Sequence, residues 1–250
     1  MEDFAYCKVA VSPVRADHSD RSEQVTQLLF GEVVTIIDRH QQWLKIQSYS
    51  DNYEGWIDGK QVHFLRLKEV NRWYDGLSVE TALTRQILAP WGKQWITRGA
   101  FVPYDNSGEF TIGKDQFEFL DDATGAPQSP VEMAVSYENA PYLWGGKSPF
   151  GIDCSALMQL SHRFFGINLP RDASQQVDMG MEIPFGEHQE GDLAFFKNSE
   201  GRIHHVGLLI NEKEIIHASG FVRTDDFTSS GIVRRTASEL SHSLFAIKRL

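Results

Sequence analysis

The sequence predicts an α+β protein, in which two small β modules precede a third domain whose helices come before its antiparallel strands. Three observations support this fold class. Short strand patterns fill residues 9–67 and 83–120, a stretch rich in Pro, Gly, Asp and Ser ("DDATGAPQSPVEMA") reads as a linker, and helical patterns followed by strand patterns occupy the remainder. The chain has 250 residues, 41% of them apolar, which is enough for one large domain or two to three small ones.

The first module, residues 1–67, is predicted to be a small β-barrel. "EVVTIIDRHQQWLKIQS" alternates apolar and polar side chains and turns at "HQQ", and "DNYEGWID" places Gly55 before the next short strand. The second module, residues 68–125, also reads as β structure, because Gly, Asn and Asp turns separate "KQWITRGAFVPY", "GEFTIG" and "DQFEFL". Between the strand patterns of the two modules, residues 78–88 could form one helical turn or more.

The third domain, residues 126–250, opens with a predicted helix that Ser129 caps and that has Pro130 at its first position. A second helix is predicted from Cys154 until a glycine ends it, because apolar residues recur on one of its faces. Four strands are expected after it, at residues 193–196, 205–210, 214–219 and 244–249.

The composition bears on partners and location. A formal net charge of -10 argues against nucleic acid and anionic membranes as partners, because both are bound through basic surfaces. No stretch approaches the roughly 20 apolar residues of a membrane helix. "MEDFAYCKVAVSP" has acidic residues where a secretory signal has Lys or Arg. We therefore expect a cytoplasmic protein, although a chain already trimmed of its signal would begin in the same way.

Cysteine usage points in the same direction. Two cysteines are too few for a disulfide framework, and as a reduced pair they fit the cytosol. Since the sequence contains neither CxxC nor HExxH, we expect no metal and no other cofactor. The expected partner is a small substrate that is not strongly anionic, bound by a monomer.

Cys154 is the candidate nucleophile. Asp153 can cap the helix that starts there, which places the thiol against unpaired backbone N–H groups and the positive end of the helix dipole. That environment favours the thiolate, which is the form of cysteine that attacks. The alternative is that Cys154 is a buried small hydrophobic residue, as free cysteines commonly are.

A nucleophilic cysteine needs a base within hydrogen-bond reach and a third group that orients the base. "HHVGLLINEKEIIHAS" offers both if it folds as a hairpin with the three-residue loop 211–213. Gly207 then lies opposite His217, and His205 and His217 become diagonal neighbours on one face, roughly 7–8 Å apart at Cα. A loop of two or four residues would place the two histidines on opposite faces.

The other histidines have simpler interpretations. His204 faces away from His217 by alternation, so His205 is the preferred base. The alternative for the pair is two half-buried polar residues in an edge hairpin. Six more histidines are expected to be solvated in turns or on polar faces: His18, His40, His63, His162, His188 and His242.

Five motifs in order and spacing relate the third domain to a known family. They are "YLWGGKSPFGIDCSALMQ", "LPRDASQQ", "GDLAFF", "HVGLLI" and "IIHAS", and they resemble the NlpC/P60 family of papain-like cysteine peptidases of bacterial cell-wall peptides. The resemblance covers about residues 129–250. It implies Cys154 as nucleophile, His205 as general base and His217 as the orienting residue.

The β region ahead resembles bacterial SH3 domains. The resemblance is strong for residues 9–67, which contain "SEQVTQLLFGE" and "YEGWID", and weak for residues 83–120. Two such modules before this catalytic domain are typical of γ-D-glutamyl-L-diamino acid endopeptidases. The resemblance thus implies a papain-like NlpC/P60 catalytic domain preceded by two small SH3-like β-barrels.

Residues around the cysteine are candidates for substrate binding. The Tyr142 hydroxyl could hydrogen-bond the thiolate or a developing oxyanion, or its ring could only fill space. Asp153 could accept a hydrogen bond from the substrate peptide as well as cap the helix. As the resemblance implies, Ser155 and Ser174 could donate to the substrate carboxylate, or they could merely cap. Arg171 could pair with a carboxylate or brace the aspartate that follows it.

The resemblance implies hydrolysis by acyl transfer, with attack of the thiolate on the amide after γ-linked D-Glu. A cytosolic protein would meet recycled wall fragments, so the expected substrates are murein-derived peptides such as L-Ala-γ-D-Glu-L-Lys or its diaminopimelate analogue. The expected product is L-Ala-γ-D-Glu. Two other functions stay open, namely a wall-peptide binding module with a silent catalytic domain, and an amidase or transacylase on the same fold.

Releasing a dipeptide requires the enzyme to recognise a free amine two residues from the scissile bond. A carboxylate from the SH3-like module is the physical means. Glu23 in "RSEQVTQ" is the candidate, with Glu32 and Tyr53 as alternatives. Each of the three could also belong to a solvated barrel surface.

Overall fold

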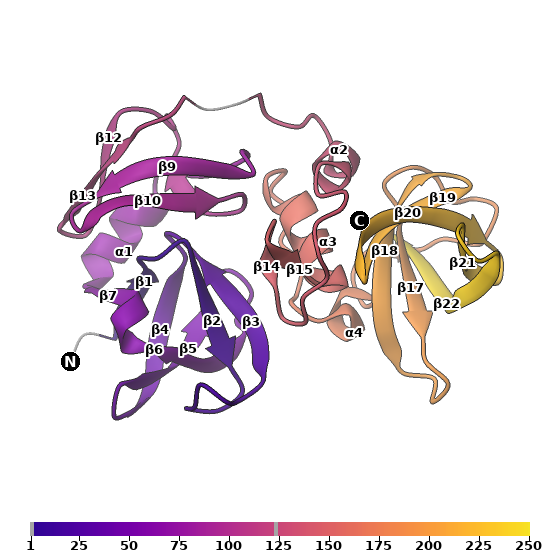
Figure 1. Ribbon diagram of the computed structural model, residues 1–250, viewed down its shortest axis with the longest axis horizontal. Helices are drawn as coiled ribbons and strands as arrows, with labels where there is room; N and C mark the ends of the chain where they lie inside the picture. Colours follow the sequence, from indigo (N-terminus) through magenta and orange to yellow (C-terminus); the bar gives the residue numbers. More distant parts are fainter. Residues whose placement is uncertain (1–2, 123–124) are drawn as a thin grey trace. The chain divides into compact units, whose positions relative to one another are not determined.

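The computed structural model describes residues 3–122 and 125–250, and the chain divides into two compact units (Figure 1). The division falls in the stretch that the sequence marks as a linker. The units comprise the described residues up to Ala126 with Lys147–Pro149, and Pro127–Gly146 with Phe150–Leu250. No helix within the two described ranges is both long and apolar enough to cross a membrane.

The first unit begins with an antiparallel sheet in the order β3-β2-β6-β5-β4-β1-β7. The predicted turn at "HQQ" is the β4–β5 connection, where Gln41 takes a positive φ of 52°. The inner side chains form a core that includes Cys7, which is fully buried. The elements are β1 (Phe4–Cys7), β2 (Val11–Arg15), β3 (Gln24–Leu29), β4 (Val33–His40), β5 (Trp43–Ser48), β6 (Glu54–Asp58), the short helix η1 (Gly59–Gln61) and β7 (Val62–Leu65).

The second β region of this unit has a helix where the sequence did not predict one. The helix α1 (Leu67–Tyr74) lies ahead of residues 78–88, and those residues, which could have formed a helical turn, contribute to strands instead. The Glu69 carboxylate accepts the Arg66 backbone N–H, which caps the helix, and Val70 and Trp73 bury one face. The strands are β8 (Leu77–Val79), β9 (Thr84–Ala89), β10 (Gly92–Thr97), β11 (Phe101–Pro103), β12 (Glu109–Ile112) and β13 (Asp115–Phe119), in the orders β10-β9-β13-β12 and β11-β8.

The two β regions of the first unit share one hydrophobic core. The Phe30 ring, which follows β3, lies edge-on to Phe117 of β13, with ring centroids 5.2 Å apart. The indole N–H of Trp73 donates to the Gly31 carbonyl at 2.9 Å, and its ring stacks on Phe110. Helix α1 and the second set of strands are therefore held to the first sheet by buried aromatic side chains.

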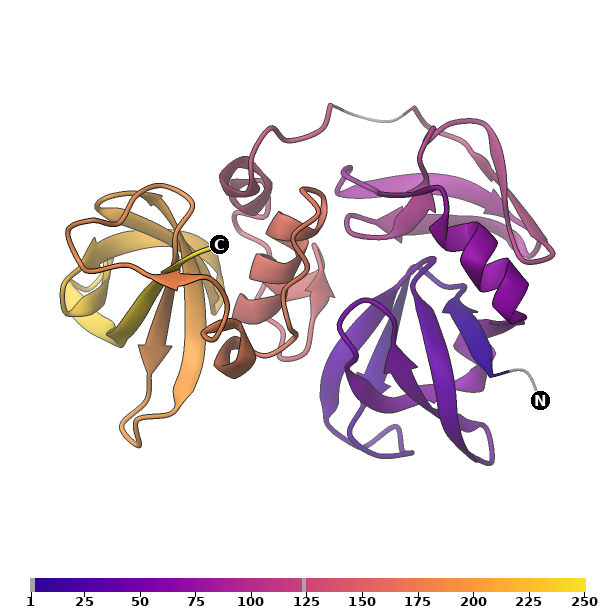
Figure 2. The same cartoon turned by 180° about the vertical axis from the view of Figure 1, so that it is seen from behind.

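The second unit places helices before a closed antiparallel sheet, as the α+β prediction requires (Figures 1 and 2). The sheet order is β16-β22-β17-β18-β19-β20-β21, and β22 also pairs with β21, which closes the sheet. Helix α3 packs against β18 and β19. The helices are α2 (Pro130–Val135), α3 (Cys154–Arg163) and α4 (Ala173–Gln176).

Three of the four predicted strands match observed strands closely, and the fourth is longer than predicted. The observed strands are β15 (Gly151–Ile152), β16 (Met181–Glu182), β17 (Leu193–Lys197), β18 (Ile203–Asn211), β19 (Glu214–Ser219), β20 (Phe221–Thr228), β21 (Gly231–Arg234) and β22 (Glu239–Arg249), and β14 (Lys147–Ser148) falls in the first unit. Neither β20 nor β21 was predicted. The β20 segment "FVRTDDFT" carries charged residues where a buried strand would be apolar.

We expect Trp73→Ala to destabilise the first unit by about 3–5 kcal/mol, because it empties a large buried volume and strands the Gly31 carbonyl. Trp95→Ala is the matched control, since that indole is half exposed and should contribute less than about 1 kcal/mol. Urea unfolding followed by circular dichroism measures both. Equal losses of stability in the two variants would contradict the shared core.

Candidate active site

Helix α3 begins at Cys154, as the sequence predicts. The Asp153 carboxylate accepts the Ala156 backbone N–H at 2.8 Å, which is the N-cap bond. It also accepts the backbone N–H of Gly145 at 2.9 Å, which ties the "WGG" segment to the start of the helix. Gly166 follows the end of the helix with a φ of 77°.

The Asp153 carboxylate forms a buried ion pair with Arg171. One guanidinium nitrogen lies 2.5 Å from Asp153 Oδ2, and the other donates to Asp153 Oδ1 at 3.1 Å and to Ser155 Oγ at 2.7 Å. Arg171 thus pairs with a carboxylate, which is that of Asp153. All three charged and polar side chains are buried, so the ion pair fixes the helix start in a rigid, water-poor setting.

The Cys154 thiol is buried beside the backbone of β18. Burial, with a further contribution from the Asp153 carboxylate, raises the pKa of Cys154 to about 12, although the Val206 backbone N–H bonded to the sulfur acts in the opposite direction. The expected stabilisation of the thiolate by the helix start is therefore outweighed in the free protein. Cys154 is a thiol at neutral pH, and it lies next to the residue that follows His205.

Tyr142 and Ser174 differ in how close they come to the thiol. The Tyr142 pKa is raised to about 12 by burial and by the neighbouring Cys154 and Asp153, which places this half-buried phenol in the electrostatic field of the thiol. Ser174 lies on α4 and is exposed. The structure therefore brings together Tyr142, Asp153, Cys154 and Ser155, with Ser174 on the neighbouring short helix.

The hairpin has a different loop from the one predicted, yet its register is the same. Asn211 pairs with Glu214 around a two-residue loop, and a β-bulge at Ile210 then restores the pairing of Leu208 with Ile216. The sequence predicted a three-residue loop, and a two-residue loop alone would have separated His205 from His217. The extra residue sits in the bulge instead, which shifts the ladder by one position and returns both histidines to the same face.

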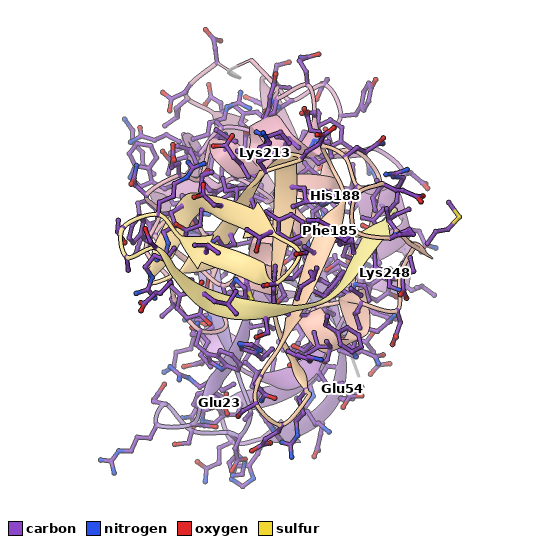
Figure 3. The ribbon with its side chains drawn as sticks, turned by 90° about the vertical axis from the view of Figure 1, so that its right-hand side faces the viewer. Glu23, Glu54, Phe185, His188, Lys213 and Lys248 are labelled. Carbon is purple, nitrogen blue, oxygen red and sulfur yellow. The ribbon has the colours of Figure 1, made fainter. Side chains whose placement is uncertain are left out.

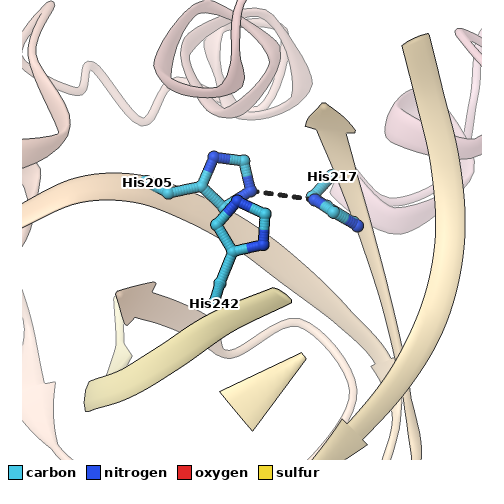
Figure 4. A group of neighbouring side chains, drawn as sticks. All are labelled: His205, His217 and His242. Carbon is cyan, nitrogen blue, oxygen red and sulfur yellow. Dashed lines mark hydrogen bonds between the residues drawn. The ribbon is translucent and has the colours of Figure 1, made fainter. Parts of the chain in front are cut away.

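His205 and His217 begin a buried chain of hydrogen bonds. His205 Nε2 lies 2.8 Å from His217 Nδ1 (Figure 4), and His217 Nε2 lies 3.1 Å from Oδ2 of Asp225 on β20. Arg223 Nε donates to the same carboxylate oxygen at 2.8 Å. His205, His217 and Asp225 are all nearly inaccessible to water. The sequence prediction missed Asp225 and Arg223, because it did not include β20.

Burial and hydrogen bonding determine the protonation states of His205, His217 and Asp225. It holds the pKa of His205 well below its usual range, with further lowering by His217 and His242, and it also lowers the pKa of His217. Burial alone would raise the pKa of Asp225, but hydrogen bonds from His217 and Arg223 hold it well below its usual range. At neutral pH the two imidazoles are therefore neutral and the carboxylate is ionised.

His242, which the sequence predicted to be solvated, is a neighbour of the two histidines. Its ring on β22 stacks on His205, with centroids 4.1 Å apart and planes at 23° (Figure 4). Burial and the nearby His217 and His204 lower the pKa of His242 to about 4. Extending the predicted strand back by two residues would have included it. The prediction of solvated rings also fails for His162 and His188, which are buried.

His205, His217 and His242 have ring nitrogens within 4.8 Å of one another, close enough to consider a metal ion. Two features of their geometry oppose it. The rings of His205 and His242 are stacked and nearly parallel, so their in-plane lone pairs lie in two separate, nearly parallel planes. His205 Nε2 and His217 Nδ1 already face each other across a hydrogen bond. The arrangement suits proton transfer better than tetrahedral metal binding.

The candidates for amine recognition lie in the first unit. Glu23, labelled in Figure 3, is exposed just before β3. Glu32 is fully buried, and its carboxylate accepts hydrogen bonds from the Leu29 backbone N–H and from Lys147. Tyr53 is half-buried. Of the two glutamates, Glu23 is the exposed residue.

Comparison with known proteins identifies a similar fold and related sequences. A crystal structure of an NlpC/P60 family protein from Bacillus cereus ATCC 10987 superposes with a TM-score of 0.80, at 19% identity, over 98% of this chain and 99% of that chain. Two curated relatives are named gamma-D-glutamyl-L-lysine dipeptidyl-peptidase. The Bacillus subtilis protein is 29% identical over 77% of this chain and 71% of its own length. The Bacillus cereus protein is 25% identical over 77% of this chain and 66% of its own length.

Two family models match separate parts of the chain. Residues 139–240 match the NlpC/P60 family, and this range contains the buried thiol and the hydrogen-bonded histidines. Residues 14–62 match the bacterial dipeptidyl-peptidase SH3 domain, and this range covers most of the first sheet. The resemblance noted from the motifs is confirmed: the chain carries an NlpC/P60 domain together with a bacterial SH3 domain of the dipeptidyl-peptidase type.

Proposed function

We propose that this protein is a cysteine peptidase that hydrolyses the γ-D-Glu–L-diamino acid bond of cell-wall peptides and releases L-Ala-γ-D-Glu. The observation that carries the proposal is a thiol at a helix start, next to β18, which also supplies the first imidazole of the buried chain His205–His217–Asp225. The names of the two Bacillus relatives support the γ-D-glutamyl specificity. The protonation states of Cys154 and His205 then determine the order of proton transfers in the proposed reaction.

In the proposed mechanism Cys154 attacks the γ-carbonyl of D-Glu while His205 takes the thiol proton. The two groups are neutral in the free protein, so the proton moves during attack rather than before it. His205 passes the proton to the departing amine of the diamino acid, which leaves a thioester on Cys154. Water, deprotonated by His205, then attacks the thioester, and Cys154 recovers its proton as the dipeptide leaves.

The neighbouring groups assist these steps in the proposal. Tyr142 is influenced electrostatically by the thiol, and the proposal assigns its hydroxyl to donate a hydrogen bond to a developing oxyanion; its raised pKa keeps the phenol protonated. His217 holds the His205 ring through their hydrogen bond. Ser155 and Asp153 are bonded to Arg171, so their contribution is to fix the helix start, with Ser174 left exposed for a substrate carboxylate.

Recognition of the free amine is the remaining part of the proposal. The substrates are murein-derived peptides such as L-Ala-γ-D-Glu-L-Lys or its diaminopimelate analogue, met in the cytoplasm as recycled fragments by a monomeric enzyme. A carboxylate is the natural partner for the L-Ala ammonium group, and Glu23 is an exposed one in the SH3 domain.

The first expected result is that Cys154→Ala abolishes release of L-Ala-γ-D-Glu from both peptides, measured by mass spectrometry of the products. Cys7→Ser is the control, because Cys7 lies in the core of the first unit. His205→Ala should be nearly inactive, and His204→Ala, at the exposed next position, should keep activity. Turnover by Cys154→Ala within tenfold of the parent would rule out the thiol mechanism, and cleavage at another bond would point to an amidase or transacylase.

The second expected result concerns pH. His205 acts only when neutral, and its lowered pKa means that the neutral form is lost only as pH falls through a value below the usual 6.5. We therefore expect kcat/KM to stay nearly constant from pH 7.5 to about 6.5 and to decline below that. Circular dichroism at each pH checks that the fold persists. A half-maximal rate at pH 6.5 or above would contradict a base shielded by burial.

The third expected result concerns the amine. Acetylation of the substrate L-Ala removes its positive charge, so kcat/KM should fall about 30-fold or more. Glu23→Ala should impair the free peptide and leave the acetylated one unchanged, which shrinks the difference between them. Glu54→Ala is the matched control, since this glutamate is also exposed and lies on β6 of the same sheet (Figure 3). Equal kcat/KM for free and acetylated peptides would contradict recognition of the free L-Ala amine. If the ratio of the two kcat/KM values in Glu23→Ala equals that of the parent, Glu23 is not the residue that recognises the amine.

A further inference from the structure

The hydrogen bonds around His217 define where the protons of both histidines lie. An ionised carboxylate only accepts hydrogen bonds, so the His217 nitrogen that faces Asp225, Nε2, must carry a proton. His217 is neutral, because burial lowers its pKa, so its other nitrogen, Nδ1, is an acceptor. The nitrogen that faces Nδ1 is His205 Nε2, at 2.8 Å, and it must therefore be the donor.

The same argument identifies the base. When a neutral imidazole carries its proton on Nε2, its Nδ1 has a free lone pair. For His205, Nδ1 is then the only nitrogen that can take a proton from the thiol. If the order of protons along the chain were reversed, Nδ1 would hold a proton and His205 could not act as a base.

We propose that Asp225 is a positioning residue that fixes the tautomers of His217 and His205 and so leaves Nδ1 of His205 free to act as the base. The proposal rests on the function proposed above, in which His205 deprotonates Cys154. Asp225 acts only through His217 and His205. Its role adds a fourth member to the thiol and the two histidines.

The setting of Asp225 supports this role. Its Oδ2 accepts hydrogen bonds from both His217 Nε2 and Arg223 Nε, and its Oδ1 accepts the backbone N–H of Arg235 at 3.1 Å. Each of these three bonds comes from a donor, so each one favours the ionised form. Arg223 is itself anchored on the Ser219 carbonyl and lies directly across the ladder from His217. The carboxylate is thereby held ionised at a fixed position relative to His217.

Asp225→Asn is the decisive variant because it keeps the shape and replaces one acceptor with a donor. If the amide nitrogen faces His217, it donates a proton there and forces the reversed order, which blocks His205. If the nitrogen faces the Arg235 backbone instead, it opposes the N–H donor of that residue. In the first orientation the nitrogen opposes the Arg223 Nε donor, so both orientations are strained. Whenever the first orientation is populated, His217 and His205 take the reversed tautomers. We expect kcat to fall about 100-fold with KM within about threefold. A loss near 10⁴-fold is known for a carboxylate bonded directly to the base, and His217 intervenes here.

Asp192→Asn is the matched control for any structural effect. Asp192 is also buried in this unit and accepts two bonds from Arg249 and one from the Gln189 backbone, yet it lies on a different stretch, ahead of β17. The two variants should lose similar amounts of thermal stability. Only Asp225→Asn should have a lowered kcat.

Two measurements on the full chain test the role of Asp225 independently of which peptide is the substrate. The rate of Cys154 alkylation by iodoacetamide needs the base but no peptide, and it should fall in Asp225→Asn and not in Asp192→Asn. Imidazole nitrogen chemical shifts should report Nε2 protonated in both histidines of the parent and the reversed tautomer in Asp225→Asn. If kcat and alkylation stay within threefold of the parent, or if they fall while both histidines keep the parent tautomers, the proposal is wrong. If the protein does not cleave γ-D-glutamyl peptides, the proposed function fails, and the alkylation rate and the imidazole chemical shifts still test the role of Asp225.

Discussion

A histidine ring enclosed in a protein barrel has to satisfy both of its nitrogens without water, and His217 does so between an imidazole and a carboxylate. This requirement orders the protons along the chain from Asp225 to His205. It also requires three consecutive strands, β18, β19 and β20, to present one residue each on the same face. The bulge at Ile210 and the ladder between β19 and β20 are what make that alignment possible. The rest of the second unit can be understood as support for this alignment.

The opposite wall of the site depends on a second buried charge. Asp153 caps α3, binds the Gly145 backbone and pairs with Arg171, so one carboxylate fixes the loop before the thiol and the helix that carries it. Its negative charge also opposes ionisation of Cys154. The resting site is thus a neutral thiol beside neutral imidazoles. In the proposed mechanism, charge separation is left to the moment of attack, when the carboxylate behind His217 can stabilise the imidazolium that forms.

Local patterns predicted the parts of the site that local rules govern. Asp153 as a cap, Cys154 at the helix start and the shared face of His205 and His217 follow from capping chemistry and strand alternation. The bulge that preserves the hairpin register could not be predicted, because a bulge has no composition signature in "LLINEKE". Asp225 was missed for a related reason, since a charged residue inside a strand becomes favourable only when Arg223 and His217 are already in place.

In the fold, too, features set by local patterns were predicted and features set by long-range contacts were missed. Helix α1 was misplaced because its position depends on Trp73 burying its ring among aromatic residues distant in the sequence. His242 was taken as solvated because its stacking on His205 depends on closure of the sheet by β22. Nothing in the residues around either position records those long-range contacts. The resemblance to a known family supplied the domain types, and the side-chain network had to come from the structure.

The proposed mechanism depends on acylation of Cys154 during peptide cleavage. The most direct test is to quench the protein with acid during turnover of L-Ala-γ-D-Glu-L-Lys and to map modified peptides by mass spectrometry. We expect an L-Ala-γ-D-Glu thioester on Cys154 that builds up and then disappears as substrate is exhausted. Continued turnover with Cys154 unmodified at every time point, or with the acyl group on another residue, would contradict it.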